Sequence, residues 1–86
     1  MTREQLIQEA TNKGAKIEFS KSYCDTEMIG IRFKNKSTYH WFISWNDKPD
    51  ARFYFYHSYS MNTGKTKRGM RHSMRINKSL NVYNYC

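Results

Sequence analysis

Acidic residues are missing from the second half of this sequence. All seven Asp and Glu side chains lie at or before Asp50, whereas seven of the fifteen Lys and Arg residues follow it. Residues 51–86 therefore carry a formal charge of +7 out of a total of +8. Because a protein surface without a charged partner usually mixes both signs, this one-sided charge predicts an anionic partner, which its field would attract and concentrate.

Cysteine is scarce as well, with two residues in the chain. Two cysteines cannot form a disulfide framework. Neither Cys24 nor Cys86 has the neighbouring cysteine or histidine that a zinc site requires. We therefore expect two free thiols in a reducing cytoplasm, and neither a metal nor another cofactor.

Long apolar runs are also absent. No segment approaches the roughly 20 apolar residues that span a bilayer, and the polar N-terminus lacks the pattern of a signal peptide. We expect a cytoplasmic protein with no membrane segment. Eighty-six residues are enough for one domain, whose stability should be modest because a chain this short buries a small share of its surface.

The apolar residues that are present first recur at helical spacing. Thr2 and Gln5 fit a capping box. The apolar residues that follow lie on one side of a helix, and Gly14 supplies a stop. The pattern predicts a helix over residues 3–12.

After Gly14 the period changes to two, which is typical of strands. Four alternating segments are separated by polar connections, the clearest of which holds the only proline, Pro49. We predict a single α+β domain over residues 1–86, with the N-terminal helix packed on a curved, mainly antiparallel β-sheet of four to five strands. The four predicted strands span residues 15–20, 28–34, 38–45 and 52–60.

The pattern weakens in the basic C-terminal third, where residues 64–78 form a cationic loop or short element. Two Met residues and two Arg residues repeat at a spacing of four, so residues 69–76 fit one or two turns of helix. A short strand fits almost as well. Residues 81–85 fit a final edge strand.

Aromatic rings crowd two of the predicted strands, with nine among the 21 residues from Tyr39 to Tyr59. Alternation places rings on both faces of these strands. One interpretation is a core on each face, with the helix on one side and the C-terminal segment or a second copy on the other. The other interpretation is a platform on which unpaired bases stack. In the last strand we expect Phe53, Phe55, His57 and Tyr59 on one face and Tyr54, Tyr56 and Ser58 on the other.

The segment at residues 64–69 holds three cations between two glycines. Glycine allows the backbone to approach a phosphate closely. The Gly-Lys-Thr string lacks the upstream glycine of a P-loop, so contact with nucleic-acid phosphates is a better interpretation than nucleotide hydrolysis. The candidate phosphate ligands are Lys65, Lys67, Arg68, Arg71, Arg75, Lys78 and Arg52, and the candidate ring contacts are Tyr54, Tyr56 and Tyr59.

Three functions fit this charge pattern. The leading hypothesis is non-catalytic binding of RNA, or of another nucleic acid, through its phosphates. A second is an inhibitor that binds an acidic host protein without RNA. A third is a small metal-independent ribonuclease, which needs a base, an acid and a cation at the scissile phosphate. Its candidates are His57, Tyr56 or Tyr59, and Arg71 or Arg75.

The layout of the chain resembles that of small phage proteins that disarm a bacterial host. The features that carry the resemblance are the capped first helix from Thr2, the ring-rich stretch from Tyr39 to Trp45 and the basic loop of residues 64–69. In size and charge the chain is similar to the phage antitoxins that block a type III toxin endoribonuclease by assembling with it and RNA. The resemblance spans the chain. It implies an RNA-binding inhibitor in the host cytoplasm and no active-site residues.

Overall fold

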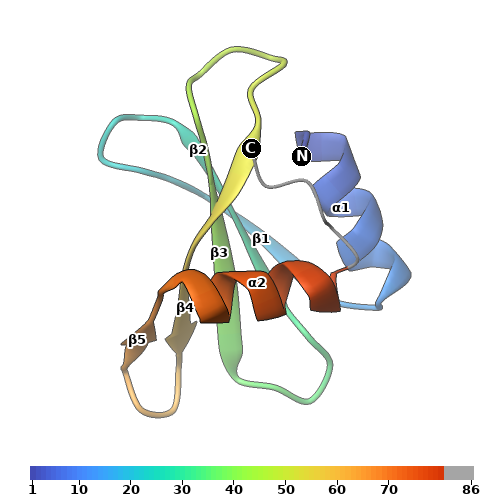
Figure 1. Ribbon diagram of the computed structural model, residues 1–86, viewed down its shortest axis with the longest axis vertical. Coiled ribbons are helices and arrows are strands. Elements are labelled where there is room, and N and C mark those ends of the chain that lie inside the picture. The colour runs from blue at the N-terminus through green and yellow to red at the C-terminus, as the bar shows by residue number, and fades with distance from the viewer. Residues whose placement is uncertain (81–86) are drawn as a thin grey trace.

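Five antiparallel strands and two helices make up the part of the chain that the computed structural model describes, residues 1–80 (Figure 1). The strands are hydrogen-bonded in chain order, from β1 to β5, and the sheet is not strongly curled. The predicted α+β fold, with an N-terminal helix on an antiparallel sheet, is confirmed. The elements are α1 (Arg3–Asn12), β1 (Lys16–Lys21), β2 (Glu27–Arg32), β3 (Thr38–Ser44), β4 (Phe53–Ser60), β5 (Thr66–Lys67) and α2 (Met70–Ser79).

Helix α1 begins at the predicted capping box. The backbone N–H of Gln5 donates to Thr2 Oγ1 at 3.2 Å, and the backbone N–H of Thr2 donates to Gln5 Oε1 at 2.9 Å. The chain leaves the helix through Gly14, whose φ of +68° suits glycine. Leu6 and Ala10 lie on the same side of α1 and are fully buried.

The second helix, α2, settles the assignment that the sequence left open at residues 69–76. Ile76 of α2 and Leu80, the C-cap residue of the helix, are four residues apart and are both buried. They join the same core cluster as α1 and strands β2 to β4, so both helices cover one face of the sheet. Packing of this apolar side stabilises a helix whose sequence pattern is weak by itself. The edge strand predicted at residues 81–85 lies outside the described residues.

Neither helix in residues 1–80 is long and apolar enough to cross a bilayer.

A β-bulge in β4 changes which side chains share a face. Trp41 of β3 pairs with His57, but the next residue of β3 pairs with Phe55, so Tyr56 is an extra residue. One extra residue moves all later side chains of the strand to the other face. The predicted faces of β4 are therefore wrong beyond the bulge. The core face carries Phe53, Phe55 and Ser58, and the opposite face carries Tyr54, His57 and Tyr59.

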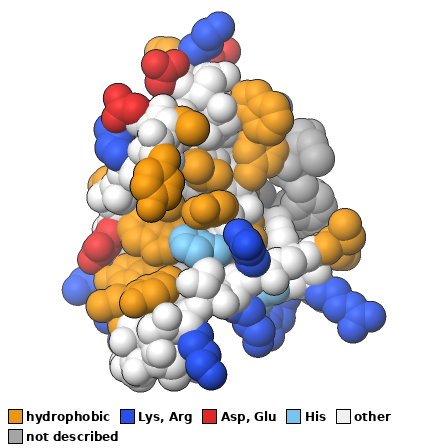
Figure 2. Space-filling model, turned by 90° about the vertical axis from the view of Figure 1, so that its left-hand side faces the viewer, with side chains coloured by type: hydrophobic (Ala, Val, Ile, Leu, Met, Phe, Trp, Pro, Cys, Tyr) orange, Lys and Arg blue, Asp and Glu red, His pale blue; other side chains and the backbone are white. Residues whose placement is uncertain are grey.

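This opposite face, called the open face below, is covered by no helix of residues 1–80, because both helices pack on the core side. Within residues 1–80, the helices therefore cover only one of the two sheet faces that carry aromatic rings. Tyr39 and Trp41 stack on the open face with ring centroids 5.9 Å apart. The hydroxyl of Tyr39 donates to Glu18 Oε1 at 2.9 Å. Figure 2, which looks at the left-hand side of Figure 1, shows hydrophobic side chains gathered across the middle of that side.

Gly30 makes room for the indole of Trp41 on this face. A Cβ added at Gly30 would lie 2.8–2.9 Å from three ring carbons of Trp41, which is closer than van der Waals contact allows. We expect Gly30→Ala to displace the indole and to lower the free energy of unfolding by about 1–3 kcal/mol. Urea unfolding and tryptophan fluorescence measure both effects. Ser20→Ala, on the exposed edge strand β1, is the control, and equal stability of the two variants would refute the packing argument.

Candidate nucleic-acid interface

A groove lies on the core side of the sheet between α2, β5 and the connection from β2 to β3. Its volume is about 660 Å³. Four cations and six hydroxyl side chains line it, together with two histidines, and no carboxylate from residues 1–80 does. This basic groove is defined by the cations Lys36, Lys65, Lys67 and Arg75, the hydroxyl residues Thr38, Ser58, Ser60, Thr63, Thr66 and Ser79, and the rings of His40 and His72.

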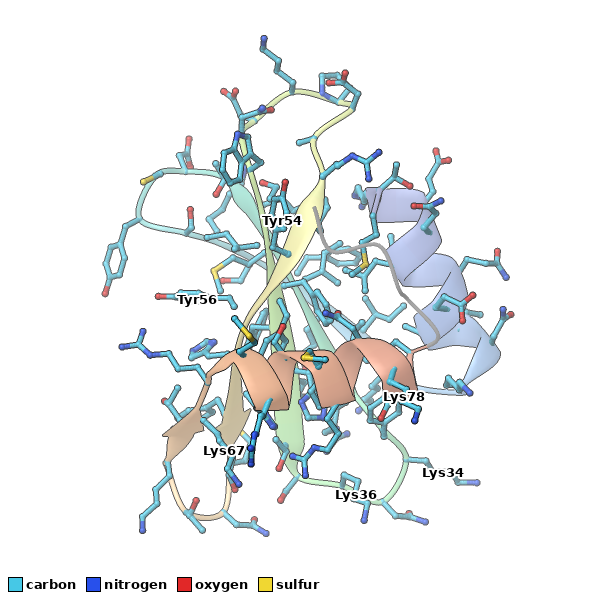
Figure 3. The ribbon with its side chains drawn as sticks, viewed as in Figure 1. Lys34, Lys36, Tyr54, Tyr56, Lys67 and Lys78 are labelled. Carbon is cyan, nitrogen blue, oxygen red and sulfur yellow. The ribbon has the colours of Figure 1, made fainter. Side chains whose placement is uncertain are left out.

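The cations of the groove are not neutralised by the acidic first half of the chain. None of them forms an ion pair with a carboxylate of residues 1–80, and the ion pair that the structure shows joins Arg3 Nε to Glu27 Oε1 at 2.9 Å. Figure 3 places Lys34, Lys36, Lys67 and Lys78 along the lower end of the molecule. In Figure 2 the carboxylates gather mainly toward the opposite, upper end. On the side that Figure 2 shows, most carboxylates therefore lie away from the end that holds the groove cations.

Hydrogen bonds link four side chains in the groove wall. Arg75 Nη2 donates to His72 Nδ1 at 2.8 Å. His72 Nε2 lies 2.7 Å from Ser58 Oγ, which in turn lies 2.6 Å from His40 Nδ1. Because arginine can only donate, His72 Nδ1 must accept, and the proton of this neutral ring is on Nε2. His72 therefore donates to Ser58, and the serine hydroxyl donates to His40.

Burial keeps the imidazoles of His40 and His72 neutral. Burial, followed by the nearby His72 and Arg75, lowers the pKa of His40 from 6.5 to about 4. Burial is also the main reason why the pKa of His72 is lowered, with the charges of Arg75 and Lys67 adding to it. At neutral pH the positive charge of the groove therefore comes from its Lys and Arg side chains.

The structure brings together some of the predicted phosphate ligands. Lys65, Lys67 and Arg75 line the groove. Arg71 and Lys78 are exposed and share one side of α2 with Arg75, because helical residues three, four and seven apart lie on one face. These five cations come from β5, the connection before it and α2.

Arg52 does not join them. It immediately precedes β4, whereas Lys67 pairs with Ser58 near the end of that strand. Arg52 and Ser58 are six positions apart in the chain, which corresponds to about 20 Å of strand.

The structure also adds a groove cation that the sequence analysis missed. Lys36 lies in the connection between β2 and β3, which the alternation pattern identified only as a polar turn. In an antiparallel meander, alternate connections lie at the same end of the sheet. The connection from β2 to β3 is therefore beside the one from β4 to β5. This rule could have shown from the sequence that Lys36 lies near the basic connection from β4 to β5, and it applies equally to Lys34 (Figure 3).

The three tyrosines predicted as ring contacts do not line the groove. Tyr54 and Tyr59 are on the open face through their pairing with Ile43 and Tyr39. Tyr56, at the bulge, is 42% exposed. Cations and tyrosines thus lie mainly on opposite sides of the same strands.

One pair of groups in the ribonuclease hypothesis is separated in the same way. His57 pairs with Trp41 on the open face, whereas Arg75 lines the groove on the core side. These two side chains therefore do not meet at one phosphate.

No family model, curated protein or solved structure matches this chain. Function therefore has to be inferred from the chemistry of the site. Within residues 1–80, no three His, Cys, Asp or Glu side chains are grouped so that they could hold a metal ion.

Proposed function

We propose that this chain is a non-catalytic RNA-binding protein that holds RNA by its phosphates in the basic groove. The observation that carries the proposal is the convergence of four cations on a hydroxyl-lined groove without a carboxylate from residues 1–80. Lys, Arg, Ser and Thr side chains are the usual ligands of nucleic-acid phosphates. Phosphate neutralisation also releases condensed counterions, which drives binding.

The resemblance to phage antitoxins supports a biological role for such binding. We propose that the chain is a cytoplasmic inhibitor that acts through an assembly of protein, RNA and a toxin ribonuclease. RNA in the groove would leave the opposite end of the molecule and the open face available for other contacts. A small domain can inhibit a larger enzyme in this way, because the RNA adds contacts that the domain alone lacks.

The salt dependence of RNA binding tests the groove. Four to six phosphate contacts, from the groove cations with or without Arg71 and Lys78, predict a slope of log affinity against log salt of roughly −3 to −5. Fluorescence anisotropy of a labelled RNA across a series of potassium chloride concentrations measures this slope. A slope near zero, or no binding at low salt, would refute the proposal.

Nuclease treatment separates this proposal from its competitors. Protein recovered from cells is expected to carry RNA, which ultraviolet absorbance detects before ribonuclease treatment and not after it. An acidic host protein that stays bound after the treatment would favour the inhibitor without RNA. Cleavage of labelled RNA without metal, lost in His57→Ala, would favour the ribonuclease.

A further inference from the structure

The open face carries a second cavity, of about 690 Å³, that RNA in the basic groove would not occupy. It lies between the connection from β1 to β2 and the bulge of β4. Met28 and Ile43, which are paired neighbours on β2 and β3, supply its half-buried apolar surface. We call it the aromatic hollow, and it is defined by Lys21, Tyr23, Met28, Ile43, Tyr56 and His57.

The rings of the hollow are available to a ligand. Tyr23 is fully exposed and Tyr56 is 42% exposed, and Figure 3 shows Tyr56 extending from β4 away from α1. The ring of Tyr56 lies 4.5 Å, centroid to centroid, from that of His57. The rings of Tyr23, Tyr56 and His57 therefore border one cavity.

Cations connect this hollow to the basic groove around the edge of the sheet. Lys67 lines the groove, and its charge acts on His72 there. Lys67 pairs with Ser58, whose side chain is on the core face. The next residue along the edge, Arg68, follows beside His57, whose side chain is on the open face. Burial chiefly lowers the pKa of His57, and the charge of Arg68 lowers it further. Since β5 is the edge strand, consecutive residues carry positive charge to both sides of that edge.

We propose that the aromatic hollow holds unpaired bases of an RNA strand whose phosphates cross the β5 edge over Lys67 and Arg68. The inference rests on the proposed function and narrows its ligand to single-stranded RNA. Bases expose their faces for stacking on tyrosine only when they are unpaired. In a duplex the bases are stacked within the helix and out of reach of the hollow.

Charge favours RNA over a second copy of this chain as the occupant. Two copies that met through their open faces would bring two strongly cationic chains, each with Arg68 near that face, into one interface. Each copy carries a net charge of +8, and like charges across an interface oppose association. A polyanion that supplies both phosphates and flat rings matches the cations and the tyrosines together.

The test compares single-stranded RNA with a duplex of the same length. The native chain is expected to bind the single strand more tightly. Tyr23→Ala combined with Tyr56→Ala should weaken single-strand binding by about 5- to 100-fold and leave duplex binding unchanged. Phe19→Ala removes a ring that is 55% exposed outside the hollow, so it should change neither affinity.

Each result has one consequence. Equal affinity of the native chain for both RNAs, or unchanged single-strand binding in the double variant, would overturn the base-binding hollow and leave the groove proposal standing. Absence of RNA binding in the native chain would overturn both. Because Tyr23 is fully exposed, Tyr23→Ala alone keeps the test valid if the double variant does not fold. A dimer that Tyr56→Ala dissociates would identify the hollow as an interface between copies and would also overturn the inference.

Discussion

Reversal of the charges of Lys36 and Lys67 together is expected to weaken RNA binding by about 100-fold at moderate salt. Each phosphate contact contributes about 0.7–0.9 to the salt slope, so two lost contacts are worth roughly 25- to 60-fold at one-tenth molar salt. The two new carboxylates would also repel the phosphates, which raises the loss further. Both lysines are exposed, so the substitutions should leave the fold intact. Anisotropy titrations of Lys36→Glu/Lys67→Glu measure the change.

A matched pair at the other end of the molecule separates the groove from net charge. Lys48→Glu/Arg52→Glu changes the formal charge by the same amount. Arg52 lies at the end of the molecule where α1 begins, because its backbone forms a β-bridge with Thr2. We expect the fold-loss of RNA affinity in this control to be less than a tenth of the fold-loss in Lys36→Glu/Lys67→Glu. The reason is that charges beyond about 10 Å are largely screened at 0.1 M salt. Equal losses in the two double variants would show that RNA responds to overall charge, and the groove assignment would be wrong.

Local signals in the sequence were sufficient for most of the fold. Thr2 and Gln5 determine where α1 begins through bonds between neighbouring residues. Alternation predicted β1 to β4, because each strand buries one face. Helix α2 was ambiguous because its stabilisation comes from burial of Ile76 and Leu80 in a distant part of the core, which no short window of sequence contains.

The candidate site was only partly predictable, for the same physical reason. The segment without acidic residues after Asp50 contains Lys65, Lys67 and Arg75, which line the groove, but not Lys36, which precedes it in the chain. The pairing of Trp41 with His57 and of Phe42 with Phe55, which creates the bulge, depends on contacts between strands. No alternation pattern reports such an insertion. The faces of His57 and Tyr59 were therefore predicted wrongly, and the separation of rings from groove cations was not foreseen.

The free energy of unfolding is expected to fall by about 3 kcal/mol between pH 6.5 and pH 4 because of His40 alone. In the unfolded chain its imidazole has an ordinary pKa of about 6.5, whereas burial lowers the pKa to about 4 in the folded protein. Between these values the unfolded state binds a proton that the folded state does not, so acid favours unfolding. This contribution is complete above pH 6.5 and is lost as the pH falls toward 4. Urea unfolding at a series of pH values measures it.

His40→Leu isolates this effect from the other titrating groups. Leucine fills most of the same buried space and cannot bind a proton, so the variant should lose about 3 kcal/mol less than the native protein over this pH range. Absolute stability will also change, because Ser58 loses the ring that accepts its hydroxyl proton, and the comparison therefore uses the slope with pH. Parallel slopes for the two proteins would mean that His40 has the same pKa in the folded and unfolded states. Below that pKa, Ser58 Oγ would accept from His40 instead of donating to it, whereas the bonds from Arg75 to His72 and from His72 to Ser58 would keep their direction.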